Sequence, residues 1–109
     1  MNKDVSIEEA RKIIAENQDN TNFLILDVRT SDEYDDGHID GAVNADIYAY
    51  DFKDRLRKLN KDGKYLVHCR TGVRSCDAAK IMKEMNFKEI YHMHEGIQGW
   101  RAKRLPLLK

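Results

Sequence analysis

Residues 64–75 read KYLVHCRTGVRS, and this stretch joins two patterns of different period. Residues 65–67, Tyr-Leu-Val, form an apolar, β-prone run typical of a buried strand, whereas residues 78–82 place apolar side chains at helical spacing. The change of period predicts that Cys69 lies where a strand turns into a helix. Backbone N–H groups collect at such a turn, because the first turn of a helix has no internal acceptors for them and the helix dipole adds positive potential.

Two arginines stand near Cys69 in the sequence and add full positive charges to this turn. They are Arg70 and Arg74. Together with the N–H groups they favour a thiolate, so we expect the pKa of Cys69 to lie below the free-thiol value of about 8.5. A larger thiolate fraction makes a better nucleophile. We therefore interpret Cys69 as a catalytic cysteine.

The composition excludes several classes of protein. The chain has 109 residues, of which 41% are hydrophobic and 35% charged, and this predicts one folded domain over residues 1–109 with a small core. Lys+Arg and Asp+Glu are equal at 19 each, so no global field favours nucleic acid or an acidic membrane surface. Any anion site must therefore be local. We expect a monomer without a cofactor.

The N-terminal residues and the cysteines indicate a cytoplasmic protein. Residues 1–4 lack an apolar signal core, and no apolar run approaches the roughly 18 residues of a membrane span. Cys69 and Cys76 are too few and too close together for a secreted disulfide framework. We expect neither a membrane nor a nucleic acid as a partner.

Strand and helix patterns alternate along the whole chain. Ser6 with Glu9, and Thr30 with Glu33, form capping boxes that predict helix starts. The first predicted elements, in chain order, are a strand opening at Val5, a helix over 7–16, a strand over 23–26, a short helix over 30–35, a turn and short β-like piece within 37–45, and a surface helix over 48–59. They are followed by a strand over 64–68, a helix with Cys76 in its first turns and an apolar face over 78–85, a strand over 89–93, and a final short helix containing Trp100. The alternation predicts an α/β fold with a mostly parallel sheet, because parallel strands need crossover connections.

Polar residues follow the strand predicted over 23–26. Asp27 and Arg29 place two charges at its C-terminal edge, where open α/β sheets build their sites. His38 allows two interpretations, a turn histidine that hydrogen-bonds to backbone or a direct participant in proton transfer. We favour the turn histidine.

These motifs, in this order and spacing, resemble the single-domain form of the rhodanese-like domain family. The resemblance runs from about Ser6 to Pro106. It rests on Asp27-Val28-Arg29 followed by Glu33 and Tyr34, Gly37-His38-Ile39 with Gly41-Ala42, the segment Cys69–Ser75, and the closing Gly96-Ile97 with Trp100 and Leu105-Pro106. It implies a three-layer α/β/α fold with a five-stranded, mainly parallel sheet, and a cysteine that carries sulfane sulfur as a persulfide.

Sulfur transfer needs a nucleophilic thiolate, a pocket for the outer persulfide sulfur, and access for an anionic donor. Cys69 would attack the outer sulfur of a donor such as thiosulfate, sulfite would leave, and the sulfur would pass to a thiol or cyanide. The residues expected to cradle the persulfide through their amides are Arg70, Thr71, Gly72, Val73, Arg74 and Ser75. Gly72 lets the backbone curl, Arg74 closes the ring and Arg70 meets the donor. The resemblance also implies that Asp27, or a nearby acid, pairs with a loop arginine.

Three other functions deserve comparison with this hypothesis. Cell-cycle tyrosine phosphatases and some arsenate reductases have a similar cysteine loop, but they place one residue more between Cys and Arg than the four between Cys69 and Arg74. The shorter ring suits a single sulfur atom. A persulfide relay that docks to a sulfur-accepting protein would use the same residues. A binding module that has lost the chemistry is disfavoured, because the cysteine and both arginines remain.

Three further features keep alternatives open. Cys76 is either a small buried side chain, which we favour, or a resolving thiol that accepts sulfur from Cys69 or forms a reversible disulfide with it. Glu95 stands where the family commonly has a second glycine, and it either restricts the donor or is a bland surface residue. His92 and His94 share a strand end, but no ligand set of the usual spacing predicts a metal site.

Overall fold

The computed structural model describes residues 1–109 as a parallel sheet of five strands with five helices. The strands are β1 (Asn2–Val5), β2 (Phe23–Asp27), β3 (Ala42–Asn44), β4 (Lys64–His68) and β5 (Glu89–Met93). The helices are α1 (Ile7–Glu16), α2 (Ser31–Asp36), α3 (Phe52–Arg57), α4 (Val73–Glu84) and α5 (Gly96–Ala102). The strand order is β1-β5-β4-β2-β3, and every adjacent pair is parallel. The predicted α/β class is confirmed.

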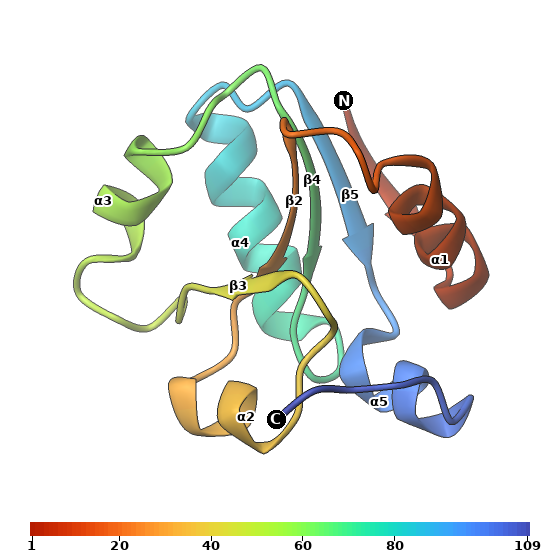
Figure 1. The fold of residues 1–109 in the computed structure, drawn as a ribbon. Helices are drawn as coiled ribbons and strands as arrows, with labels where there is room; N and C mark the ends of the chain where they lie inside the picture. Colours follow the sequence, from red (N-terminus) through yellow and green to blue (C-terminus); the bar gives the residue numbers. More distant parts are fainter.

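Helices cover both faces of the sheet, with α3 and α4 on one side and α1 and α5 on the other (Figure 1). The central strand β4 serves both layers because its side chains alternate between the faces. Tyr65 and Val67 join the core beneath α3 and α4, and Leu66 between them joins the core beneath α1 and α5. A strand covered on both faces explains the continuous apolar run in the sequence. None of the five helices combines the length and the apolar character needed to cross a lipid bilayer.

Side-chain caps fix the starts of two helices as predicted. The Ser6 hydroxyl accepts from the amide of Glu9, and the Glu9 carboxylate accepts from the amide of Ser6. Thr30 and Glu33 make the same reciprocal pair before α2. Each box satisfies amides that the first helical turn leaves without a partner.

Some element boundaries differ from the prediction. The helix expected over 48–59 is only the six residues of α3, because the Asp46 carboxylate accepts from the amide of Tyr48 and holds a turn there. Val5 ends a strand rather than opening one, since β1 pairs with β5 through residues 2–5. Helix α4 begins at Val73, five residues before the apolar spacing that starts at Ala78, and includes Cys76 in its first turns as predicted. Its first turn is polar or exposed and carries no apolar periodicity.

A buried ion pair lies at the end of β2. The Arg29 guanidinium donates to both carboxylate oxygens of Asp27, at 2.7 to 3.1 Å, and to the carbonyl of Gly37 at 2.7 Å. Both side chains are almost completely inaccessible to solvent. The pair therefore connects the end of β2 to the turn after α2. Because water does not reach either side chain, each charge is stabilised by the opposite charge of its partner.

Asp27→Ala should destabilise the fold by about 3–5 kcal/mol, because it leaves the Arg29 guanidinium buried without its counter-charge. Asp54→Ala is the matched control, since Asp54 pairs with Arg57 on the surface of α3 and its loss should cost at most about 1 kcal/mol. Urea unfolding of the two variants measures the difference. Equal losses of stability would contradict this account of the buried pair.

Candidate active site

Cys69 lies immediately after β4 and is 1% exposed. Two neighbouring segments hold the backbone around it. The amide of Val28 donates to the carbonyl of His68 at 3.0 Å, and the amide of Ile97 donates to the carbonyl of Cys69 at 2.9 Å. The first amides of α5 thus bind the carbonyls of the cysteine loop and hold them away from the sulfur. The loop's own N–H groups then face inward.

The sulfur of Cys69 is surrounded by hydrogen-bond donors. The amide of Gly72 lies 3.1 Å from Sγ and the hydroxyl of Ser75 lies 3.3 Å from it. Burial raises the pKa of the Cys69 thiol, but the Ser75 hydroxyl and the amides of Ser75, Gly72 and Thr71 stabilise the thiolate and outweigh it. The pKa of Cys69 therefore lies below its ordinary value, in the direction that the sequence predicts.

Two glycines make this curled backbone possible. Gly72 has φ +104°, and a Cβ there would lie 2.3 Å from the carbonyl oxygen of His94. Gly96 has φ +64°, and a Cβ there would lie 2.3 Å from the carbonyl oxygen of Arg70. Glu95, by contrast, has φ −75° and ψ −17°, a right-handed conformation that any residue adopts. Its backbone explains why a side chain is tolerated where the family commonly has glycine.

The two loop arginines lie in different environments. Arg74, in the first turn of α4, donates to both carboxylate oxygens of Glu33 at 2.6 and 2.9 Å. This pairing, together with the Thr30 cap, lowers the pKa of Glu33 to about 2 against the opposing effect of burial. Asp27, which we expected as a partner for a loop arginine, pairs with Arg29 instead, because Arg29 reaches it within the same buried turn. Glu33 is the nearby acid that pairs with the loop.

Arg70 makes no ion pair and lines a hollow of about 370 Å³. The hollow also contains Arg29, Glu33, Asp36, Ile97, Gln98 and Arg101. The Arg70 guanidinium has no carboxylate partner, so its positive charge in the hollow is not neutralised. An anionic donor would require such a charge.

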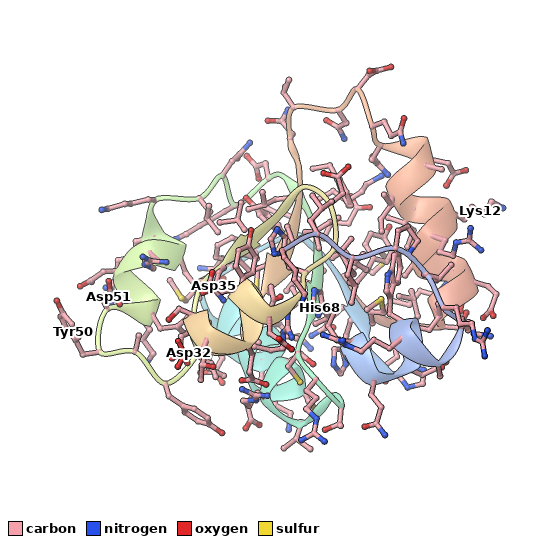
Figure 2. The ribbon with its side chains drawn as sticks, turned by 60° about the horizontal axis from the view of Figure 1, so that its bottom comes forward. Lys12, Asp32, Asp35, Tyr50, Asp51 and His68 are labelled. Atoms are coloured by element: carbon pink, nitrogen blue, oxygen red, sulfur yellow. The ribbon has the colours of Figure 1, made fainter.

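His68 is buried beneath the site and lies in the middle of the fold, whereas Lys12 and Tyr50 lie at its edges (Figure 2). Its Nδ1 atom lies 3.2 Å from the carbonyl oxygen of Cys69. Burial lowers the pKa of His68, and the charge of Asp27 opposes this only in part. A neutral imidazole that donates from Nδ1 to this carbonyl supports the loop backbone from below.

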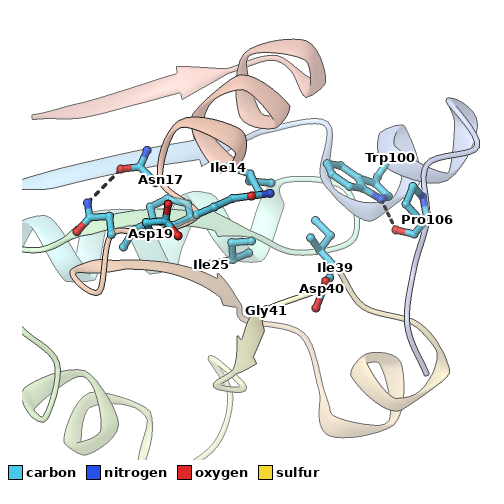
Figure 3. Close-up of a pocket in the computed structure, with 12 residues that line it drawn as sticks. Ile14, Asn17, Asp19, Ile25, Ile39, Asp40, Gly41, Trp100 and Pro106 are labelled. Atoms are coloured by element: carbon cyan, nitrogen blue, oxygen red, sulfur yellow. Dashed lines mark hydrogen bonds between the residues drawn. The ribbon is translucent and has the colours of Figure 1, made fainter.

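A larger cavity lies elsewhere, between α1, β2 and the C-terminal segment (Figure 3). It measures about 650 Å³ and is lined partly by Asn17, Asp40 and Trp100. Neither Cys69 nor any residue of its loop contributes to it. It holds no nucleophile, so its size alone does not make it the reaction site.

A family model for the rhodanese-like domain matches residues 6–103. The chain belongs to this family. A rhodanese-related protein of Thermoplasma volcanium has a similar structure, with a TM-score of 0.79 and 25% identity, and the likeness covers 97% of each chain.

Three relatives bear names that describe sulfur chemistry. The rhodanese-like domain is 29% identical to the thiosulfate sulfurtransferase GlpE of Coxiella burnetii, over 94% of this chain and 90% of that protein. It is 34% identical to the probable adenylyltransferase/sulfurtransferase MoeZ of Mycobacterium tuberculosis, over 77% of this chain and 21% of that protein. It is 35% identical to the putative sulfur carrier protein YrkF of Bacillus subtilis, over 72% and 42%. The chain thus corresponds to less than half the length of the last two proteins.

Other predicted residues lie around this rhodanese-like site without reaching the sulfur. Cys76, the fourth residue of α4, is partly exposed rather than buried as we expected, because it opens onto the hollow lined by Asp4 and His92, and it is not in a disulfide. His38 stacks on Tyr34 with ring centroids 3.9 Å apart, and its Nδ1 lies 3.0 Å from the carbonyl oxygen of Tyr34. This is the geometry of a turn histidine. No three His, Cys, Asp or Glu side chains converge where they could hold a metal ion.

Sequence reasoning missed two contacts of the site. The sequence predicts Glu33 as a helix cap and as part of the motif after Asp27, but it does not single out Glu33 as the acid that holds Arg74. His92 was considered only as a metal ligand, whereas its Nε2 lies 2.6 Å from Ser75 Oγ. Glu33 stands six residues after Asp27 in the same motif, and this proximity is a sequence signal for a role at the site. Nothing in the local sequence of His92 indicates the contact, because it depends on how β5 packs against α4.

Gly96→Ala should destabilise the protein by about 1–3 kcal/mol more than Gly41→Ala. Gly41 also has a positive φ, +85°, but a Cβ there meets nothing within 4 Å, so Gly41→Ala isolates the backbone strain of about 1–2 kcal/mol. A Cβ at Gly96 would in addition strike the carbonyls of Cys69 and Arg70. Denaturant unfolding gives the comparison, and a smaller loss for Gly96→Ala than for Gly41→Ala would show that the loop is not closely packed.

Glu33→Gln should reduce stability by about 1–3 kcal/mol at neutral pH, and the reduction should shrink as the solution is acidified. The folded pKa of Glu33 lies near 2, below its ordinary value of 4.5. The stabilisation is therefore complete above about pH 5 and is lost as the pH falls from 4.5 towards 2. Unfolding free energies measured across this range test the claim.

Asp35→Asn is the control, because Asp35 is an exposed acid of the same helix that makes no hydrogen bond or ion pair. Asp35 and Asp32 both lie on α2 (Figure 2). A difference for Glu33→Gln that stayed constant from neutral pH to pH 2 would rule out the Arg74 pairing as its cause.

Proposed function

We propose that this protein is a sulfurtransferase that carries sulfane sulfur as a persulfide on Cys69. The observation that carries the proposal is the set of hydrogen-bond donors around Cys69 Sγ. A buried thiol of lowered pKa there faces the inward-pointing amides of a short loop. Such a cradle stabilises a thiolate before the reaction and a persulfide anion after it. The relatives named as sulfurtransferases and sulfur carrier support the same class of reaction.

Thiosulfate is the donor that we propose, and its reaction balances without a co-reactant. The Cys69 thiolate attacks the outer sulfur of thiosulfate, a new S–S bond forms, and the old S–S bond breaks with its electron pair leaving on sulfite. The product is the Cys69 persulfide anion. Arg70, unpaired in its hollow, would attract the dianionic donor and the departing sulfite. The relative named thiosulfate sulfurtransferase matches along nearly its whole length, which supports this donor.

The acceptor in this proposal is a small thiol or cyanide, which attacks the outer persulfide sulfur and regenerates the Cys69 thiolate. The supporting residues act on the loop and not on the sulfur itself. Arg74 is held by Glu33, and Asp27 with Arg29 secures the strand end beneath. Thr71 and Val73 contribute backbone to the loop, whereas the Val73 side chain is 70% exposed.

A persulfide relay to a partner protein is the second candidate function. An exposed apolar side chain on the loop favours it. Val73 follows Gly72 directly and is 70% exposed. It offers an apolar contact for a partner next to the thiol, and one relative is named as a sulfur carrier. Efficient turnover with small thiols alone would argue against the relay, and a mixed disulfide with a protein through Cys69 would support it.

An oxyanion enzyme of the phosphatase or arsenate reductase type fits the site less well. Only four residues separate Cys69 from Arg74, and Arg74 is already occupied by a bidentate carboxylate. A tetrahedral oxyanion would need that guanidinium free. Activity on a chromogenic phosphate ester, measured beside activity with thiosulfate and cyanide, distinguishes the two.

The wild-type protein should gain one sulfur atom after incubation with thiosulfate, and the Cys69→Ser variant should gain none. Intact mass spectrometry reads the result directly. Cys76→Ser is the matched control, because it removes the other thiol of the chain and should still gain one sulfur. The proposal fails if the wild type stays unmodified across several sulfane donors, or if Cys69→Ser still takes up sulfur.

A further inference from the structure

Four side chains form a continuous hydrogen-bonded series that begins at the reactive sulfur. Ser75 Oγ lies 3.3 Å from Cys69 Sγ, His92 Nε2 lies 2.6 Å from Ser75 Oγ, and His92 Nδ1 lies 3.1 Å from Asp4 Oδ1. The series passes from a buried thiol to an acid whose side chain is 73% exposed. Sulfur transfer as described above uses only the Ser75 contact, which leaves His92 and Asp4 without a role.

The fold brings these residues together from distant parts of the chain. Asp4 and His92 are direct partners in the parallel register of β1 and β5. His92 alternates with Tyr91 and Met93, which face the α1 side, so its ring points towards α4. Ser75 is the third residue of α4 and is fully buried. The side chain of His92 is only 6% exposed, so its two hydrogen bonds fix the ring with little competition from water.

We propose that Ser75, His92 and Asp4 form a proton relay that removes the proton of the Cys69 thiol and delivers it towards solvent. This inference rests on the proposed function only because it takes Cys69 as the reacting thiol. Ser75 touches the reacting sulfur, whereas His92 and Asp4 are positioning residues that act through it.

The proton transfer balances within these four groups. In the thiol state, S–H donates to Ser75 Oγ, the Ser75 hydroxyl donates to His92 Nε2, and Nδ1–H donates to Asp4. The thiol proton then moves to Ser75 Oγ as the hydroxyl proton moves to Nε2. The products are a Cys69 thiolate and a His92 imidazolium. In that state Nε2–H donates to Ser75, whose hydroxyl donates to the thiolate, so every hydrogen bond is kept.

The direction of the Ser75 hydroxyl distinguishes the two states. A serine has one proton to donate, and it can face the thiolate only if His92 supplies a proton to the serine oxygen. With Nδ1 held by Asp4, His92 must then carry protons on both nitrogens. The carboxylate of Asp4 faces the ring at hydrogen-bond distance and can accept from Nδ1–H in that form.

Other charges surround His92, but none is placed as Asp4 is. They come from four neighbouring segments: Lys3 of β1, His68 of β4, Cys76, Asp77, Lys80 and Lys83 of α4, and His94 after β5. His68 is kept neutral by burial. Only Asp4 and Ser75 hydrogen-bond to the ring, so these two contacts are the direct routes for a proton to or from it.

The relay leads to a different side of the loop from the one that receives the donor. Asp4 and His92 line a hollow of about 450 Å³ together with Gly72 and Cys76. Arg70 lines the separate hollow described above, and the two have no residue in common. A proton can therefore leave through Asp4 while an anionic donor occupies the Arg70 side.

The test is the pH dependence of Cys69 alkylation by iodoacetamide, followed by the mass of the peptide that contains Cys69. This readout needs no sulfurtransferase activity. His92→Gln keeps an N–H donor for Ser75 but cannot take up a proton, and it should raise the midpoint of thiolate formation by about one pH unit, a roughly tenfold loss of rate below the midpoint. Asp4→Asn should give a smaller rise in the same direction.

Two control variants match these changes without touching the series. His94→Gln removes an exposed imidazole from the same hollow, and Asp77→Asn removes an exposed carboxylate from it. Both should leave the alkylation midpoint where it is in the wild type. Asp4→Asn also guards against a folding defect, because Asp4 is exposed and its substitution does not disturb the core.

A double variant, Ser75→Ala with His92→Gln, tests whether the residues act in series. Its midpoint should rise no further than that of Ser75→Ala alone, since a broken first link already disconnects the histidine. Unchanged midpoints in His92→Gln and Asp4→Asn would overturn the relay, as would strictly additive shifts in the double variant.

Failure of the relay and failure of the proposed function are separable. If the wild type gains sulfur from thiosulfate but the midpoints do not move, the relay is wrong and the function stands. If the midpoints move as expected but no sulfur is gained from any sulfane donor, the relay stands and the sulfurtransferase proposal is wrong.

Discussion

The site depends on one backbone constraint, that the chain leaves β4 at Cys69 and enters α4 at Val73 with its amides turned towards the sulfur. An ordinary loop would turn some of its carbonyls inward and repel a thiolate. Here the amides of Ile97 and Gln98, at the start of α5, bind the carbonyls of Cys69 and Arg70 from outside. The two glycines with positive φ follow from the same constraint, since the two segments approach each other too closely for a Cβ on either of them.

Two of the three arginines around this loop are paired with carboxylates, so only part of the positive charge there is uncompensated. The Glu33 carboxylate holds Arg74 in a bidentate pair, and Asp27 holds Arg29 in a buried one. Both arginines therefore act as structural ties between segments, and their positive charges are largely compensated where they lie. Arg70 is the loop cation that has no carboxylate partner. Residue type alone would have treated the three arginines as equivalent, and the difference between them lies entirely in their partners.

The sequence predicts local features well and long-range contacts poorly, for a physical reason. Capping boxes, apolar runs and the position of Cys69 depend on neighbours within a few residues, and they are visible as patterns. The shortened helix α3 was missed because Tyr48 fits a helical period although the Asp46 carboxylate holds a turn at its amide. The Glu33–Arg74 pair spans 41 positions and the Asp4–His92 pair spans 88. Both depend on packing and strand register, which no local pattern encodes.

The two steps that we propose lie on opposite sides of β4, one towards β2 and the other towards β5. On the β2 side, Arg29, Glu33 and Arg70 gather around one hollow, which presents positive charge to an anion. On the β5 side, His92 and Asp4 offer a path for a proton. Because Cys69 ends the strand between them, its sulfur can exchange a proton with one side and a sulfur atom with the other. In this proposal the loop itself separates the path of the departing proton from the hollow that receives the anionic donor.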